Sequence, residues 1–195
     1  MKAKFLTILF AIISITSFAQ NQKAEHLIFK GVPIDGTLAE YVSKMKQNGF
    51  NHVSTEDGTA ILNGDFAGYK ACVVGVSTLK QKDLVHKIAV VFPEKETWST
   101  LFGNYSSLKE LLTEKYGNPS EVVEKFDGAE YAQPKDDNKK MFMVKLDNCR
   151  YHSIWHTEKG DIELSIGHDI KCFVTLDYFD KVNGGIVREK AKDDL

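Results

Sequence analysis

Cysteine and proline are scarce in this chain, and positive charge is not in excess. The 195 residues contain three cysteines and four prolines, and the net charge at pH 7 is −2. No two cysteines have the C-x2-C spacing of zinc sites, so a zinc site is not predicted. Proteins that bind nucleic acids neutralise phosphates with lysine and arginine, and this chain has no surplus of either. We therefore predict no nucleic-acid partner.

Familiar catalytic motifs are missing as well. The sequence has no G-x-S-x-G, no H-E-x-x-H, no phosphate-binding glycine loop and no EF-hand calcium pattern. We predict no catalytic residue, no metal and no cofactor. Serine, cysteine and histidine are present, so an alternative is an envelope hydrolase whose site is assembled from distant residues. Such a site requires a deep pocket in which a histidine lies at hydrogen-bond distance from a carboxylate or cysteine.

The first 19 residues are typical of a secretion signal. Lys2 and Lys4 precede an apolar run over 5–18, and Ala19 is the small residue expected before a cleavage site. The run is shorter than the ~20 apolar residues of a membrane-spanning helix. We expect cleavage before Gln20, export to the periplasm or the cell exterior, and no stable membrane span afterwards. An uncleaved N-terminal anchor is the alternative.

Two stretches of similar pattern predict helices. Thr37 and Glu40 form a capping box, an apolar stripe follows them at helical spacing, and Gly49 marks the end. Seventy residues later, Ser107 and Glu110 repeat the box. The second stripe continues to Tyr116 and Gly117. Helical spacing also extends back to Lys95, but Gly103-Asn104 predicts a break or kink within that segment.

Strand signals follow each helix. Runs of alternating apolar and polar residues joined by short turns predict antiparallel meanders. The expected strands are 26–32, 50–55, 60–66, 69–77, 84–92, 120–126, 141–146, 150–157, 161–166 and 170–179. Between two of them, Asp127–Lys140 is polar and predicts a mobile surface loop.

These elements together predict an α+β fold of two tandem units. Each unit is expected to be a helix, or a helical hairpin, packed on an antiparallel β-meander. The first unit is expected over 20–94 and the second over 95–182, with a charged C-terminal tail over 183–195. Helices on one side of a sheet leave its other side open to solvent or to a partner.

Three segments carry a family resemblance. Phe29–Leu38, Gly49-Phe50 and Leu111–Pro119 resemble segments of small secreted proteins of Bacteroides-type bacteria, a largely uncharacterised group. The expected duplication is also similar to the β-lactamase-inhibitor-protein-like architecture. In that family a concave sheet face binds a protein partner, so the resemblance implies an open sheet face with the same kind of role. No inhibitory binding residue of that family can be matched to a residue of this chain.

The strand predicted over 150–157 supplies most of the candidate binding residues. Arg150, His152 and His156 share one face of it and could form a cationic patch. The two histidines would lie ~13 Å apart along a strand, too far to share a metal ion. Phe173 points outward if its neighbours at 172, 174 and 176 face the core, and an exposed aromatic side chain marks a binding surface. The alternative for this face is ordinary solvation.

Cys149 and Cys172 lie on predicted strands of the same unit. In an oxidising compartment they could form a disulfide, which would leave Cys72 unpaired. The alternative is that all three are small buried apolar residues.

These observations favour an exported, non-catalytic binding module of the cell envelope. Its partner would be a protein or an envelope component, bound through the open sheet face or the 127–140 loop. The envelope hydrolase is one alternative. A structural or folding-assistance role without a specific ligand is another.

Overall fold

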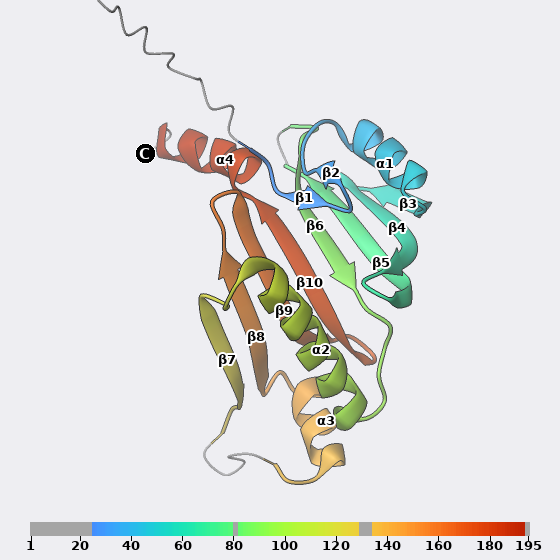
Figure 1. Cartoon of the computed structure of the whole chain (residues 1–195), viewed down its shortest axis with the longest axis vertical. Helices are drawn as coiled ribbons and strands as arrows, with labels where there is room; N and C mark the ends of the chain where they lie inside the picture. The colour runs from blue at the N-terminus through green and yellow to red at the C-terminus, as the bar shows by residue number, and fades with distance from the viewer. Residues whose placement is uncertain (1–24, 80–81, 129–133, 194–195) are drawn as a thin grey trace, which may run out of the picture.

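The computed structural model describes residues 25–79, 82–128 and 134–193. Within them, four helices and ten strands make an α+β fold, as predicted (Figure 1). The secretion signal predicted over Met1–Ala19 lies outside these residues. No described helix combines the length and the apolar character needed to cross a bilayer.

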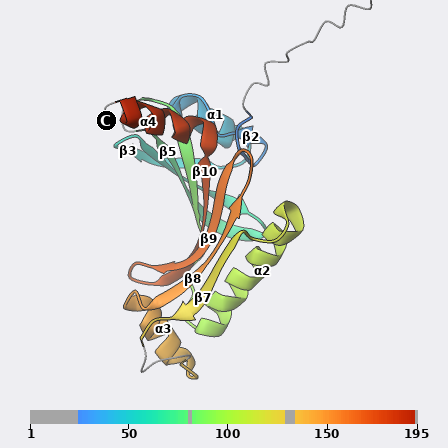
Figure 2. The same ribbon diagram turned by 90° about the vertical axis from the view of Figure 1, so that its left-hand side faces the viewer.

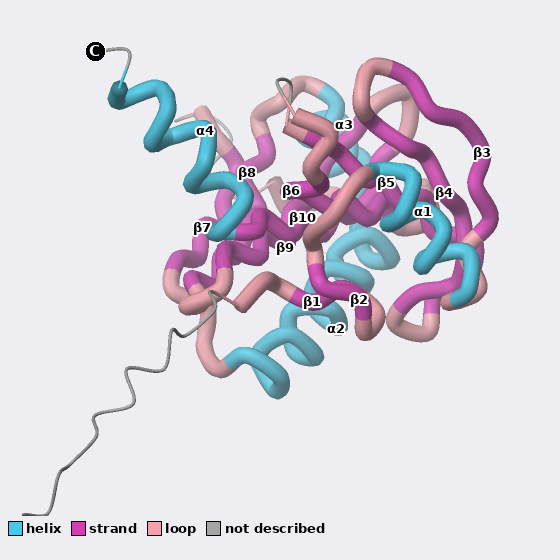
Figure 3. Tube along the Cα trace, turned by 90° about the horizontal axis from the view of Figure 1, so that it is seen from above, coloured by secondary structure: helices cyan, strands magenta, loops and turns pink. Residues whose placement is uncertain are grey.

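Eight strands form one antiparallel sheet in the order β3-β4-β5-β6-β10-β9-β8-β7. The first half consists of β3 (Asn51–Glu56), β4 (Thr59–Phe66), β5 (Tyr69–Thr78) and β6 (Val85–Val91). The second half consists of β7 (Glu121–Phe126), β8 (Cys149–His156), β9 (Gly160–His168) and β10 (Cys172–Asp180). Each half is a meander, and the last strands of the two halves, β6 and β10, pair with each other. The sheet therefore runs unbroken from β3 at one edge to β7 at the other (Figure 3).

One face of this sheet is the core. Along β10, alternate residues from Cys172 to Asp180 are buried, and the register carries the same alternation across the sheet. One buried row crosses six strands through Leu62, Val74, Val90, Leu176, Leu164 and Ser153. Figure 2 shows the sheet bending, with α2 along its convex side.

Helix α1 (Leu38–Gln47) begins where the sequence predicts. The Thr37 hydroxyl accepts from the Glu40 backbone N–H, and the Glu40 carboxylate accepts from the Thr37 N–H, which confirms the capping box. Tyr41 and Met45 are buried against the sheet.

Helix α2 (Trp98–Tyr116) differs from the prediction at its start. It is continuous through Gly103, so the predicted break is wrong, and its N-cap is Thr97. The Ser107–Glu110 pattern therefore lies inside the helix and is not a capping box. A glycine costs a helix only about 1 kcal/mol, and the apolar side chains that α2 buries on the sheet outweigh that cost. Gly117, with φ 84°, ends the helix as predicted.

Two further helices lie in segments that were predicted as a loop, a strand and a charged tail. Helix α3 (Asp137–Lys145) occupies the end of the predicted 127–140 loop and most of the predicted strand 141–146, so both predictions are wrong there. The Asp136 carboxylate caps it by accepting from the Lys139 N–H at 3.0 Å. Helix α4 (Lys181–Asp193) occupies most of the predicted charged tail and follows β10 directly.

The strand predicted over 26–32 is a small hairpin of β1 (Ile28–Phe29) and β2 (Val32–Pro33). Lys30 and Gly31 form its two-residue turn, both with positive φ, which suits the twist of a tight hairpin. This hairpin precedes α1, whereas α3 interrupts the second meander. The two halves therefore differ in their insertions, and a repeated ancestral unit stays a prediction.

Candidate functional site

The face of the sheet opposite the core is the candidate site. We call it the open face; it comprises the outward residues of the sheet, and two neighbouring rows cross its middle. One row is Val73, Val91, Thr175, Ser165, His152 and Val123. The other is Ile61, Gly75, Ala89, Asp177, Glu163, Ile154 and Glu121. These side chains are half-buried or exposed, in contrast with the buried rows on the other face.

The open face combines apolar and charged side chains. At its centre, Lys87 Nζ lies 2.9 Å from an Asp177 carboxylate oxygen and 4.6 Å from the centroid of the Phe179 ring. One row away, the Ser165 and Thr175 hydroxyls are hydrogen-bonded at 2.7 Å. These cross-strand contacts hold the polar groups in place without burying them. The surface is therefore ordered before any partner arrives.

The structure places all four predicted site residues on this side of the sheet, but they are not one cluster. Arg150 and His156 lie at opposite ends of β8, with the half-buried His152 between them. Phe173 lies two strands away at the start of β10, against the backbone of Gly167. No sequence pattern indicated that Lys87 contacts Asp177 and Phe179, because these contacts depend on the register between β6 and β10.

Carboxylates neutralise both outer positions of the predicted cationic patch. The Arg150 guanidinium pairs with Asp127, which lowers the pKa of that carboxyl. His156 lies between two carboxylates, with Nδ1 2.8 Å from Asp161 and Nε2 3.3 Å from Glu121. Hydrogen bonding to Asp161, and then to Glu121, raises the pKa of His156. This end of the open face therefore has mixed charge.

A titration tests the His156 arrangement. We expect an NMR pKa for His156 above the ordinary value near 6.5. The D161N/E121Q variant should bring that pKa back towards the ordinary value. Because the folded pKa is the higher one, these pairs stabilise the protein below the unfolded-state pKa. That stabilisation is lost as pH rises through the folded-state pKa. An unchanged His156 pKa in the double variant would contradict the contacts, and His168, beside Asp147, serves as the internal reference.

The three cysteines are free thiols, so the possible Cys149–Cys172 disulfide is absent and the alternative of unpaired cysteines holds. Cys149 begins β8 and Cys172 begins β10, so β9 runs between them. Two strand spacings place their Cα atoms about 10 Å apart, beyond the ~7 Å limit for the Cα atoms of a disulfide. Burial raises the pKa of the Cys149 thiol to about 12 and also raises that of Cys172. Both behave as small apolar side chains.

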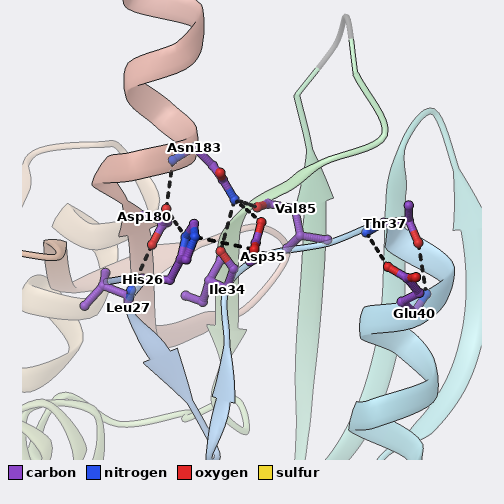
Figure 4. Close-up of polar contacts among 9 residues, drawn as sticks. All are labelled: His26, Leu27, Ile34, Asp35, Thr37, Glu40, Val85, Asp180 and Asn183. Carbon is purple, nitrogen blue, oxygen red and sulfur yellow. Dashed lines mark hydrogen bonds and ion pairs between the residues drawn. The ribbon is translucent and has the colours of Figure 1, made fainter. Parts of the chain in front are cut away.

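A buried polar network lies where β10 passes into α4 (Figure 4). The fully buried Asp180 accepts from the backbone N–H of Leu27 at 2.8 Å and from that of Asn183 at 2.9 Å. His26 Nδ1 lies 3.0 Å from Asp180, and His26 Nε2 lies 3.4 Å from Asp35. The Asn183 amide donates to the backbone oxygens of Ile34 and Val85. The network joins the start of the described chain, the turn before α1 and α4, so its role is structural.

Within residues 25–79, 82–128 and 134–193, no group of three or more histidine, cysteine or acidic side chains could hold a metal ion. No protein-family model matches the chain, and neither the curated proteins nor the solved structures contain a significant match.

Proposed function

We propose that this protein is an exported, non-catalytic binding module that engages a protein partner through the open face. The observation that carries the proposal is the asymmetry of the sheet. Helices α1, α2 and α3 pack against the buried side. The opposite side presents half-exposed rows that continue across at least six strands. A face of this breadth suits a folded partner better than a small molecule.

The chemistry of the open face supports the same proposal. Protein interfaces combine apolar anchors with polar groups at defined positions. Phe173, Phe179 and Ile154 offer partly exposed apolar surface, and Val73 is 41% exposed. The Lys87–Asp177 and His156–Asp161 pairs supply charges of both signs. Since every strand of these rows except the edge strand β7 is paired on both sides, little conformational entropy is lost when a partner docks.

The second surface predicted for partner binding, the 127–140 segment, now includes part of α3. Residues 129–133 lie outside the described residues. On α3 and just after it, Phe142 is 60% exposed and Leu146 is 50% exposed. This small patch provides a matched control for the open face.

The test uses two double variants of Gln20–Leu195 with equal changes in composition and charge. The open-face variant is H152E/F173S. The control variant is H52E/F142S, in which His52 on β3 and Phe142 on α3 are both exposed. A partner captured from envelope extracts is identified, purified and titrated against the parent and both variants, with circular dichroism confirming their folds.

We expect the dissociation constant to rise at least tenfold for the open-face variant, as for removal of an apolar anchor. It should change less than about twofold for the control, because rim contacts contribute little. The reverse pattern would move the interface to α3. Equal binding by all three proteins would exclude the open face.

A further inference from the structure

A groove lies on the other side of the sheet, between the β1–β2 hairpin, the C-terminal end of α2 and the turn from β8 to β9. We call it the α2 groove. Its larger part is a cavity of about 610 Å³, within the ~300–1,000 Å³ typical of small-molecule sites. Its apolar lining includes Leu27, Phe66, Tyr116 and Tyr178. The fixed turn at Lys30-Gly31 contributes to one wall.

The groove continues along α2 as a narrower, almost wholly apolar space. A second cavity of about 160 Å³ shares Phe66, Tyr116 and Tyr178 with the first. Leu108, Leu111 and Leu112 extend it along the helix. Leu111 is 49% exposed, so this apolar surface opens to solvent. Besides the three aromatic residues, the two cavities also share Lys115, and we call the larger cavity the wide end of the groove.

The charge at the wide end is predominantly positive. Lys30, Lys115 and Lys159 line it, together with one carboxylate, Glu158. Lys159 pairs with Glu25 at 2.5 Å. Lys115 lies 4.9 Å from the Tyr116 ring centroid, and Lys30 lies 5.9 Å from that of Phe50. No carboxylate of the described residues lies within ion-pair distance of Lys30 or Lys115. The whole chain has a net charge of −2, so the excess of positive side chains at the wide end is opposite in sign to the net charge of the protein.

The C-terminal end of α2 carries a partial negative charge, which would oppose an anion. Two contacts reduce that effect. Lys115 lies in the last turn of the helix, and the Gly117 carbonyl is occupied by the Trp155 indole N–H at 2.9 Å.

We infer that the α2 groove binds an amphiphile with a single alkyl chain and an anionic head group, of the fatty-acid class. The alkyl chain lies along Leu108, Leu111 and Leu112, where transfer of its methylenes out of water favours binding. The carboxylate lies at the wide end and accepts charge-assisted hydrogen bonds from Lys30 and Lys115. This site faces away from the open face, so it is independent of the partner proposed above.

Isothermal titration of protein expressed from the full chain tests this inference, with laurate as the probe below its micellar concentration. We expect saturable binding of one laurate. Acetate should bind at least tenfold more weakly, because it lacks the alkyl chain. Dodecyltrimethylammonium, with the same chain and a positive head, should also bind at least tenfold more weakly.

Variants then assign the two parts of the site. K30E/K115E and, separately, L111E should each raise the laurate dissociation constant at least tenfold. K44E/K125E carries the same charge change at exposed positions elsewhere. It should change the laurate dissociation constant less than about twofold. If K30E/K115E does not fold, K30Q/K115Q replaces it with the same expectation. Absence of saturable laurate binding overturns the inference, as do equal affinities for the cationic amphiphile or for acetate. Unchanged laurate affinity in the lysine variants also overturns it.

Discussion

Gly160→Ala is expected to lower the free energy of unfolding by about 3 kcal/mol or more. Gly160 is the first residue of β9 and has φ +153°, a conformation that alanine adopts only with strain. A Cβ at this position would lie 2.0 Å from the Phe179 carbonyl oxygen and 2.6 Å from Leu27 Cδ1. Backbone strain and overpacking therefore act together, and the backbone of β10 cannot move aside without breaking its pairing with β9.

Urea unfolding followed by circular dichroism measures this loss. Gly103→Ala is the matched control, because Gly103 lies within α2 and nothing is within 4 Å of an added Cβ. That variant should gain up to about 1 kcal/mol from the better helix propensity of alanine. A loss below ~1 kcal/mol for Gly160→Ala would contradict the close approach of β9 and β10, since even modest overpacking costs that much.

Asp180→Ala should cost about 3–5 kcal/mol, as expected when one partner of a buried, charge-assisted network is removed. The Asp180 side chain is fully buried. Its loss leaves the Leu27 and Asn183 N–H groups and the His26 ring without their acceptor. Buried donors without partners each cost about 1–3 kcal/mol. Asp180→Asn keeps one acceptor oxygen and should cost less.

Hydrogen exchange distinguishes this network from a general contribution to the core. Since Asp180 joins β10 to α4 and to Leu27, amides of α4 should lose protection before those of β9 and β10. Asp169→Ala, at an exposed turn position, is the control and should stay within ±0.5 kcal/mol. Uniform loss of protection over the whole sheet would show that Asp180 acts on the core as a whole.

The sequence determined the elements whose signals are local. The capping box at Thr37 and Glu40 has its donors and acceptors within four residues, so α1 follows from the pattern alone. Alternation over 161–166 and 170–179 predicted β9 and most of β10, with their buried faces, because side chains on a strand alternate with period two. Residues 170 and 171 precede the observed strand. Tyr151 and Trp155, at alternate positions of β8, are buried in the core on the same principle.

Local sequence patterns gave a wrong prediction where the spacing of apolar residues fits both a strand and a helix. Met141–Leu146 alternates like a strand, yet Met141 and Val144 are also three residues apart, as on a helix. The Asp136 cap, and the hydrogen bond from the Ser99 N–H to the Asp137 carboxylate, favour α3. The second of these contacts joins residues 38 positions apart, so no local pattern contains it. Likewise, α2 stays helical at Gly103 because its apolar side chains pack on the sheet, and no local pattern contains those contacts.

The position of the candidate sites was decided by the tertiary structure alone. Arg150, His152, His156 and Phe173 were assigned to outward faces from their strand patterns. The acids that neutralise two of them, and the Lys87–Asp177 pair at the centre, depend on which strands are neighbours. The α2 groove joins Lys30, Lys115 and Lys159 from three distant segments. Sequence periodicity specifies which face of each element is apolar, whereas the pairing of β6 with β10 specifies which faces and charges lie side by side.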